Sequence, residues 1–363
     1  MAHLVCVAGA TTGATGLIFD SSTRQIVSEV QGRGIIPLEQ DESALYLRVQ
    51  EICNSLAEAA PQRLPEPSAF IFSLSSQVRY DSQQVLCSAI SHSRLRTRDA
   101  PRLSWITRGE ACWWVSDTAR DAIILKIGTV GFAHAFDQSF PSAPDTWRAG
   151  GWGLLSGDDG GAYFIGRQVL YRLFEEQDGR RKRTDFSESF AEMLRQDQTR
   201  AVTTWIRQHK DTYALRIEVS KLAQAAISLA EQRHDEFSAR LLRRAAAKLA
   251  RCVAAVISMA QRNDGTYGQR PIDVMVQGRL VQYSPMYAGF IRDAVLRICP
   301  GQLHLRPLRW SPVLGCLQKG LVTLLNWQRR DAASAATYAA ASHPLLNVEF
   351  APEVERMLFE GAS

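Results

Sequence analysis

Residues 149–166 read AGGWGLLSGDDGGAYFIG, and this stretch says more about the fold than any other part of the chain. Glycines surround Trp152, Ser156 and the acidic pair Asp158 and Asp159, and an apolar-aromatic helix start follows. Glycine lets the backbone approach a ligand closely and adopt a positive φ without a Cβ penalty. The first turn of the following helix is expected to aim free N–H groups at whatever the glycines surround.

The composition is typical of a globular protein. The chain has 363 residues, 46% hydrophobic and 22% charged, with a formal net charge of +5. This length predicts two domains or one large bilobal unit. The mild positive charge does not indicate nucleic-acid binding. The basic run at 179–183 is interpreted as a solvated loop.

The seven cysteines are scattered through the chain, with no CxxC and no Cys/His cluster. This pattern argues against zinc and iron–sulfur sites, and the odd number argues against a disulfide framework. The apolar N-terminus lacks the positive n-region of a signal peptide and is expected to form a first strand. No apolar run reaches 18 residues, so we expect no membrane span and a cytosolic location.

Strands and helices alternate in the first 130 residues, which predicts an α/β architecture. Expected strands lie at 3–8, 16–19, 25–30, 69–74, 105–107 and 122–128, and later at 272–278 and 303–305. Expected helices lie at 43–60, 82–91, 166–177, 186–208, 217–232, 236–262, 285–298 and 313–327. The β-rich segments 3–30 and 122–135 would each begin one of two related lobes.

The 149–166 string closely resembles the GGWG…GDxGS signature of the BadF/BadG/BcrA/BcrD ATPase family, which includes N-acetylglucosamine kinases. The resemblance implies two actin/hexokinase-type (ribonuclease H-like) α/β lobes around a central cleft, with ATP and Mg²⁺ as cofactors. The expected domains are an N-terminal lobe at 1–120, a C-terminal lobe with a helical insert at 121–335, and a segment at 336–363 packing back on the N-terminal lobe. A weaker match to the family's DGRG…T segment lies at 176–184. The implied ligand is a small molecule, with no nucleic acid or membrane partner, and a homodimer is left open.

The resemblance also implies functional positions. Glu110, in Gly109–Ala111, and Asp158 take the catalytic places, Glu110 as the base. The expected substrate-binding residues are Gly150, Gly151, Trp152, Asp158, Asp159, Ser75 and Ser76. The expected nucleotide-binding residues are Gly9, Thr11, Thr12, Gly13, Gly128, Thr129, Gly131 and Gly278. No metal ligand is assigned.

The nucleotide-facing motifs depart from the family pattern. Ala8 replaces the aspartate that the family uses for Mg²⁺, an ion usually held by one or two carboxylates together with phosphates. Val130 replaces a glycine, and a β-branched residue resists a positive φ. One of two glycines is missing before Gly278. We therefore expect weak or absent MgATP binding.

Three functions remain open from the sequence. The first is an ATP-dependent kinase of a small hydroxylated, amino-sugar-like substrate. The second is a pseudokinase that binds a ligand without phosphoryl transfer. The third is a cleft that uses Asp158, Asp159 and Glu110 for other acid/base chemistry. A shared fold does not decide among them.

Overall fold

The computed structural model describes most of the chain. The described residues are 3–35, 41–60, 64–74, 80–116, 121–137, 147–153, 157–194, 212–263, 265–298, 302–326, 328–340, 343 and 346–359. The chain divides into two compact units. Unit 1 is Met1–Asp117 with Arg309–Val348, and unit 2 is Thr118–Leu308 with Glu349–Ser363.

This division differs from the expected boundaries near the C-terminus. Residues 309–335 belong to unit 1 because helix α11 (Pro312–Leu325) packs on strands of the first sheet. The segment expected at 336–363 is divided between the units. Helix α12 (Arg329–Ala340) packs on α11, whereas α13 (Pro352–Phe359) packs on a helix of unit 2.

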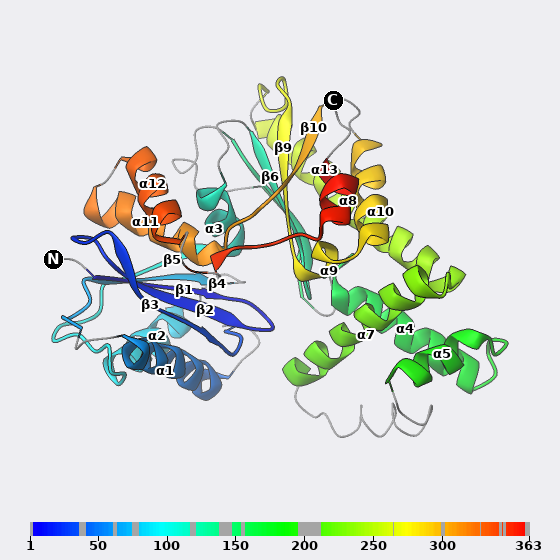
Figure 1. Ribbon diagram of the computed structural model, residues 1–363, viewed down its shortest axis with the longest axis horizontal. Helices are drawn as coiled ribbons and strands as arrows, with labels where there is room; N and C mark the ends of the chain where they lie inside the picture. The colour runs from blue at the N-terminus through cyan, green and yellow to red at the C-terminus, as the bar shows by residue number, and fades with distance from the viewer. Residues whose placement is uncertain are drawn as a thin grey trace. The chain divides into compact units, whose positions relative to one another are not determined.

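Unit 1 contains a five-stranded sheet in the order β3-β2-β1-β4-β5 (Figure 1). Its strands are β1 (His3–Gly9), β2 (Ala14–Asp20), β3 (Gln25–Gly32), β4 (Ala69–Leu74) and β5 (Leu103–Thr107). The first three form an antiparallel meander, and β4 and β5 continue the sheet in parallel with β1.

Both faces of this sheet are covered by helices. Helices α1 (Glu42–Ala59) and α2 (Tyr80–Ser91) lie on one side, and α3 (Arg108–Val115), α11 and α12 lie on the other (Figure 1). Val5, Val7, Phe70 and Phe72 join the core under α1 and α2. A strand buried on both faces needs a continuous apolar run, which is why residues 3–9 read HLVCVAG instead of alternating.

Unit 2 repeats the same topology with a second sheet in the order β10-β9-β6-β7-β8. Its strands are β6 (Ala122–Ile127), β7 (Gly131–Phe136), β8 (Trp147–Gly150), β9 (Ile272–Gln277) and β10 (Leu303–Pro307). Strands β6 to β8 form the antiparallel meander, and β9 and β10 follow in parallel. The sequence therefore predicted correctly that two similar segments begin two related units.

The helices of unit 2 occupy most of the chain between β8 and β9 and follow the later strands. They are α4 (Ala162–Gln177), α5 (Asp185–Leu194), α7 (Thr212–Gln232), α8 (Glu236–Asn263), α9 (Arg279–Gln282), α10 (Pro285–Leu296) and α13. Helix α8 packs against β7, β8 and α10 through the buried stripe that its periodicity predicted. Helix α5 begins as expected, and residues 195–208 of the helix predicted there lie outside the described residues.

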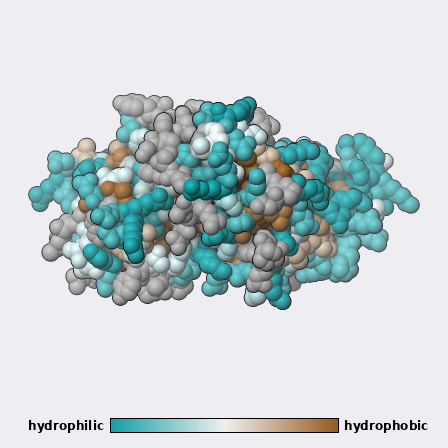
Figure 2. Space-filling model, turned by 90° about the horizontal axis from the view of Figure 1, so that it is seen from above, coloured by the Kyte–Doolittle hydropathy of each residue, from teal (hydrophilic) through white to brown (hydrophobic). Residues whose placement is uncertain are grey.

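Hydrophilic side chains cover most of the described surface on the face shown in Figure 2. Hydrophobic residues come to this surface only in limited patches. Among the helices of the described residues, none has the length and apolar character needed to cross a membrane.

Candidate functional site

The glycine-rich string forms the connection from β8 to α4 in unit 2. Asp158 is completely buried there and adopts a left-handed backbone with φ +62°. Its carboxylate forms an ion pair with the guanidinium of Arg216 on α7. Two buried opposite charges hold this connection against α7, so the conformation at Asp158 is fixed by a partner that the string itself does not contain.

Asp159 has a different environment from its neighbour. Its carboxylate pairs with Lys248 of α8 at 2.7 Å, and 38% of its side chain is exposed. The Lys248 ammonium also lies 5.3 Å from the ring of Phe164. The acidic pair is therefore divided between one buried and one partly exposed ion pair.

The loop that follows β6 is hydrogen-bonded to the first N–H groups of α4. Ala162 N–H donates to Gly128 O at 2.8 Å, and Tyr163 N–H donates to Thr129 O at 3.1 Å. The prediction that these N–H groups would be free for a ligand is therefore wrong, because carbonyl oxygens of the loop accept them. A Cβ on Gly161 would lie 2.5 Å from Thr129 O, so this glycine is required by close backbone packing.

The same loop was expected to bind phosphate through Gly128, Thr129 and Gly131. Val130 does not adopt a positive φ, so the loop lacks the glycine-type conformation that the resemblance implied. Gly131 lies against the backbone of Asp159 and Gly161. These residues join the loop to the start of α4, and the structure gives them this packing role.

Arg148 on β8 lies beside the first glycines of the string. Its Nη2 donates to Gly151 O at 2.8 Å, and its guanidinium lies 5.9 Å from the centroid of the Trp152 ring. Gly151 has φ +70°, and a Cβ there would lie 2.6 Å from Arg148 Nη2. Burial lowers the pKa of Arg148, and the charge of Asp158 opposes this shift. Trp152 is 69% exposed, so its ring is available to a ligand.

His134 lies opposite Arg148 in the β7–β8 ladder. The side chain is buried and packs against Phe136 with ring centroids 4.4 Å apart. Burial first, and then the charge of Arg148, lowers the pKa of His134 to about 3. The imidazole is therefore neutral at physiological pH and serves as a packed core residue.

In unit 1, the turn after β1 contains the residues expected to form the first phosphate loop. Ala8 is 3% exposed, and Ala10 N–H donates to Gly13 O at 2.8 Å to close the turn. Arg108 Nη1 donates to Gly9 O at 3.0 Å. Burial lowers the pKa of Arg108. A guanidinium group therefore lies against this turn, and Ala8 supplies no carboxylate.

The other nucleotide-loop residues of unit 1 differ in exposure. Thr11 is buried, and Thr12 is exposed. A Cβ on Gly9 would lie 2.8 Å from Ile35 O, so close packing already explains this glycine.

Glu110, the expected catalytic base, belongs to the first turn of α3. Its carboxylate accepts a hydrogen bond from Thr107 N–H at 2.6 Å, while Thr107 Oγ1 accepts one from Glu110 N–H at 3.2 Å. This reciprocal pair is a capping box, which satisfies two N–H groups that the helix cannot bond internally. Ser75 and Ser76, the other expected substrate residues of unit 1, lie outside the described residues.

Gly278 follows β9 and has φ +148°. A Cβ at this position would overlap the carbonyl of Ile127, so the backbones of β6 and β9 approach closely here. The amide oxygen of Gln277 accepts a hydrogen bond from Lys126 Nζ. The end of β9 is therefore a packed junction within unit 2.

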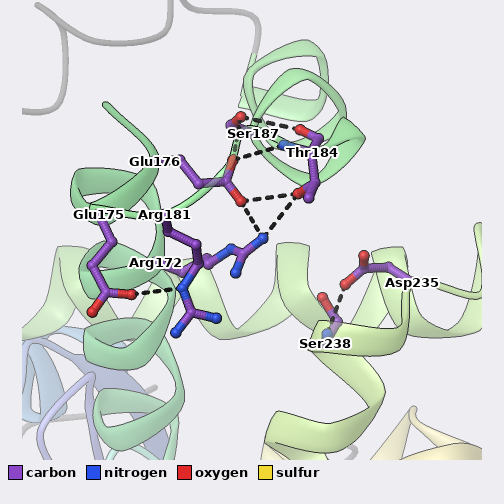
Figure 3. A network of polar contacts seen from close by, with 8 residues as sticks. All are labelled: Arg172, Glu175, Glu176, Arg181, Thr184, Ser187, Asp235 and Ser238. Carbon is purple, nitrogen blue, oxygen red and sulfur yellow. Dashed lines mark hydrogen bonds and ion pairs between the residues drawn. The ribbon is translucent and has the colours of Figure 1, made fainter. Parts of the chain in front are cut away.

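The segment matched at 176–184 connects α4 to α5 through a polar network (Figure 3). Buried Glu176 pairs with Arg172 and accepts hydrogen bonds from Thr184 Oγ1 at 2.9 Å and Ser187 Oγ at 2.7 Å. In the basic run beyond it, Arg181 pairs with Glu175 at 3.0 Å. The segment holds two helices together, and its basic residues face solvent as expected.

The structure adds three arginines that the sequence did not single out, namely Arg108, Arg148 and Arg216. Each is anchored by a hydrogen bond or ion pair near a predicted loop. Arg148 directly precedes the glycine-rich string in the sequence, and this position could have identified it as a candidate site residue. Arg216 is about sixty residues away in the sequence, and no local pattern distinguishes a buried arginine from a solvated one on a helix.

In the part of the chain that the structure describes, no three His, Cys, Asp or Glu side chains gather closely enough to hold a metal ion.

Neither a protein-family model nor a curated protein sequence matches this chain. Solved structures do match it. A candidate N-acetylglucosamine kinase from Chromobacterium violaceum aligns with TM-score 0.63 and 20% identity, covering 87% of this chain and 98% of that one. A candidate N-acetylglucosamine kinase from Porphyromonas gingivalis aligns with TM-score 0.58 and 13% identity, covering 89% and 100%. A ROK family glucokinase from Streptomyces griseus, solved with glucose and AMPPNP, aligns with TM-score 0.50 and 10% identity, covering 84% and 94%.

These similarities establish the fold. The predicted class is confirmed: the chain has the two-lobed α/β fold of actin/hexokinase-type sugar kinases, with one mixed five-stranded sheet in each unit.

Proposed function

We propose that this protein is a sugar-kinase-like binding protein. Its unit 2 binds a sugar-like small molecule beside the 150–159 string, and it does not transfer phosphate from MgATP as a working kinase does. The binding part of the proposal relies on the string itself. The exposed Trp152 ring, the carbonyl-anchored Arg148 and the peptide groups of Gly150 and Gly151 offer both apolar and polar contacts within a few residues.

The observation that carries the second part lies at the end of β1. The resemblance implies a Mg²⁺-supporting carboxylate at the position that Ala8 occupies. Ala8 is buried, and the nearby Gly9 carbonyl accepts a hydrogen bond from the Arg108 guanidinium. Mg²⁺ is held through one or two carboxylates plus phosphates. A fixed cation without a carboxylate is a poor match to that requirement.

The remaining nucleotide-facing groups fit ATP no better. An anion bound at a helix start needs free N–H groups, and those of Ala162 and Tyr163 are bonded to the preceding loop. The proposed catalytic base is engaged as well, because the Glu110 carboxylate accepts a hydrogen bond from Thr107 N–H. We therefore derive no phosphoryl-transfer step for this chain.

A second candidate is an active ATP-dependent kinase of an amino sugar such as N-acetylglucosamine. It is favoured by one observation, the fold shared with a glucokinase solved with glucose and AMPPNP. In that case Glu110 would accept the proton of the substrate hydroxyl, after leaving the capping box.

Two measurements on the purified full chain distinguish these candidates. The first is calorimetric binding of glucose and N-acetylglucosamine, and the second is ADP release with each sugar in the presence of MgATP. We expect sugar binding without sugar-dependent ADP release. Release at ordinary enzyme rates, above about 1 s⁻¹, would establish the kinase and overturn the proposal. Glu110→Gln then separates the two roles of that carboxylate, since the amide keeps an acceptor for Thr107 N–H and cannot take a proton.

A further inference from the structure

Three arginines of unit 2 gather around the buried start of α4. Arg216 of α7 pairs with Asp158, and Arg148 of β8 bonds to the Gly151 carbonyl. Arg167, one turn along α4 from Tyr163, places its guanidinium 5.9 Å from the centroid of that ring. The charge of Asp158 acts on both Arg148 and Tyr163, and Arg167 and Arg216 both act on Tyr163, so the three arginines belong to one corner of unit 2.

Positive charge exceeds negative charge in this corner. Of the three guanidinium groups, Arg216 is the one paired with Asp158. Neither Arg148 nor Arg167 forms an ion pair with any described residue. The nearby carboxylate of Asp159 is paired with Lys248. Two positive charges are therefore uncompensated among these residues.

The guanidinium groups of Arg148 and Arg167 also have unsatisfied hydrogen-bond donors. Arg148 and Arg167 are half-buried, and the Nε of each is inaccessible to solvent with no hydrogen-bond partner among the described residues. Arg148 lies over Phe132, and Arg167 lies over Tyr163. Such cation–π contacts offset only part of the cost of removing a cation from water.

We propose that Arg148 and Arg167 bind the oxyanion of an acidic, sugar-like ligand, a carboxylate or a phosphate, at the corner formed by Trp152, Asp158 and Tyr163. Because the Nε atoms are covered, the donors offered to the ligand are the Nη groups, and the two Nη groups of a planar guanidinium can bind a carboxylate or phosphate in a bidentate manner. This inference rests on the proposed function, and it replaces a neutral sugar with an acidic one. The buried Arg216–Asp158 pair positions the corner, and the exposed Trp152 ring offers an apolar surface to the rest of the ligand.

The electrostatics of Tyr163 show that two of these arginines lie near its ring. Burial raises the pKa of the Tyr163 phenol, the charges of Arg167 and Arg216 oppose the shift, and those of Tyr171 and Asp158 add to it. An oxyanion between these side chains would find donors without a competing free carboxylate, because Asp158 is engaged with Arg216.

The test measures binding of four probes to the full chain by calorimetry at two salt concentrations. Glucuronate and glucose 6-phosphate are the acidic probes, and glucose and N-acetylglucosamine are the neutral ones. We expect at least one acidic probe to bind about ten-fold tighter than glucose, with affinity falling as salt rises. The tighter of the two acidic probes identifies the oxyanion as a carboxylate or a phosphate.

Arg167→Gln should lower acidic-probe affinity at least about ten-fold and leave glucose affinity unchanged. Arg167→Lys keeps the positive charge but loses the paired guanidinium donors, so its affinity for the acidic probe should lie between those of the wild type and Arg167→Gln. The matched control is Arg240→Gln, an exposed arginine of unit 2 paired with Glu236, and it should bind like the wild type. Melting temperatures of all variants verify folding.

The possible failures are distinguishable. If neutral sugars bind and acidic probes bind no tighter, this inference is overturned and the proposed function stands. Acidic-probe affinity that Arg167→Gln leaves unchanged also overturns it. If none of the four probes binds, both this inference and the proposed function fail.

Discussion

The first hairpins of the two units occupy the same place in the same topology, but their turns are held by different groups. In unit 1 the end of β1 is held by a side chain, because Arg108 donates to the Gly9 carbonyl at 3.0 Å. In unit 2 the loop after β6 is held by backbone, because the first N–H groups of α4 donate to Gly128 and Thr129. In unit 2 these N–H groups are therefore not free for a phosphate, whereas in unit 1 the bonded group is a carbonyl oxygen.

The difference shows which part of the fold tolerates change. A hydrogen bond from a side chain, such as that of Arg108, is removed by substituting one residue. Close packing of two backbone segments, as between the loop after β6 and the start of α4, needs glycine at the points of contact. Gly131 and Gly161 meet where a Cβ would collide with backbone, and Gly13 in unit 1 has a looser environment. Gly9 of unit 1 also packs closely, since a Cβ there would lie 2.8 Å from Ile35 O, so of these glycines Gly13 is the one with room for a side chain.

The largest expected effect comes from breaking the buried ion pair between Asp158 and Arg216 in unit 2. Asp158→Asn leaves Arg216 buried without its partner charge, and removing one member of a buried pair costs about 3–5 kcal/mol. Asp159→Asn is the matched control, because its pair with Lys248 is partly exposed and contributes about 0–1 kcal/mol. Urea unfolding of the wild type and both variants measures the change in the free energy of unfolding.

Equal destabilisation by the two substitutions would contradict the buried role given to Asp158. A functional assay of Asp158→Asn is interpretable only when the folded fraction is measured alongside it, since the substitution acts on stability as well as on charge.

A smaller effect is expected from adding a methyl group at Gly161, the N-cap of α4 in unit 2, and at Gly13, in the β1–β2 turn of unit 1. Gly161→Ala in unit 2 would bring a Cβ to 2.5 Å from Thr129 O, whereas Gly13→Ala in unit 1 would leave 3.4 Å to Gly32 O. Overpacking of a rigid contact costs about 1–3 kcal/mol, and a tolerated alanine stays within about 0.5 kcal/mol. Thermal melts of both variants measure the loss of stability. A larger loss for Gly13→Ala than for Gly161→Ala would contradict the close backbone contact described at Gly161.

The third effect is the smallest at neutral pH and grows as the solution is acidified. The pKa of His134 is about 3 in the folded state against an ordinary value of 6.5, so the unfolded chain binds the proton more readily. Its contribution to stability is fully present above pH 6.5 and is lost as pH falls towards 3. Within this window, one proton changes the unfolding free energy by about 1.4 kcal/mol per pH unit.

Replacing His134 should remove this slope. His134→Gln, followed by urea unfolding between pH 4.5 and 6.5, is expected to show a flatter dependence than the wild type by up to one proton. Parallel curves for the two proteins would show that His134 is not buried in its neutral form.

The sequence predicted the framework well because strand and helix periodicity is a local property. The strands at 3–8 and 122–128 and the long helix at 236–262 are confirmed within a few residues. Short elements such as α3 and β8 were not anticipated, because four to eight residues carry little periodicity.

The site was predicted less completely. The resemblance indicated Asp158, but its partner Arg216 is distant in sequence and reaches it only because α7 packs along α4. Likewise, the carboxylate of Glu110 suggested acid/base chemistry, and its hydrogen bond to Thr107 depends on where α3 begins. Tertiary partners decide whether a polar residue is free to act, and local sequence does not contain them.

The central claim is that this sugar-kinase fold has lost the groups that hold MgATP. Calorimetric titration of the full chain with ATP, with and without Mg²⁺, tests it directly. We predict weak or undetectable binding that Mg²⁺ does not improve, because Ala8 offers no carboxylate and Arg108 occupies the Gly9 carbonyl. A dissociation constant in the low micromolar range that depends on Mg²⁺ would contradict the account.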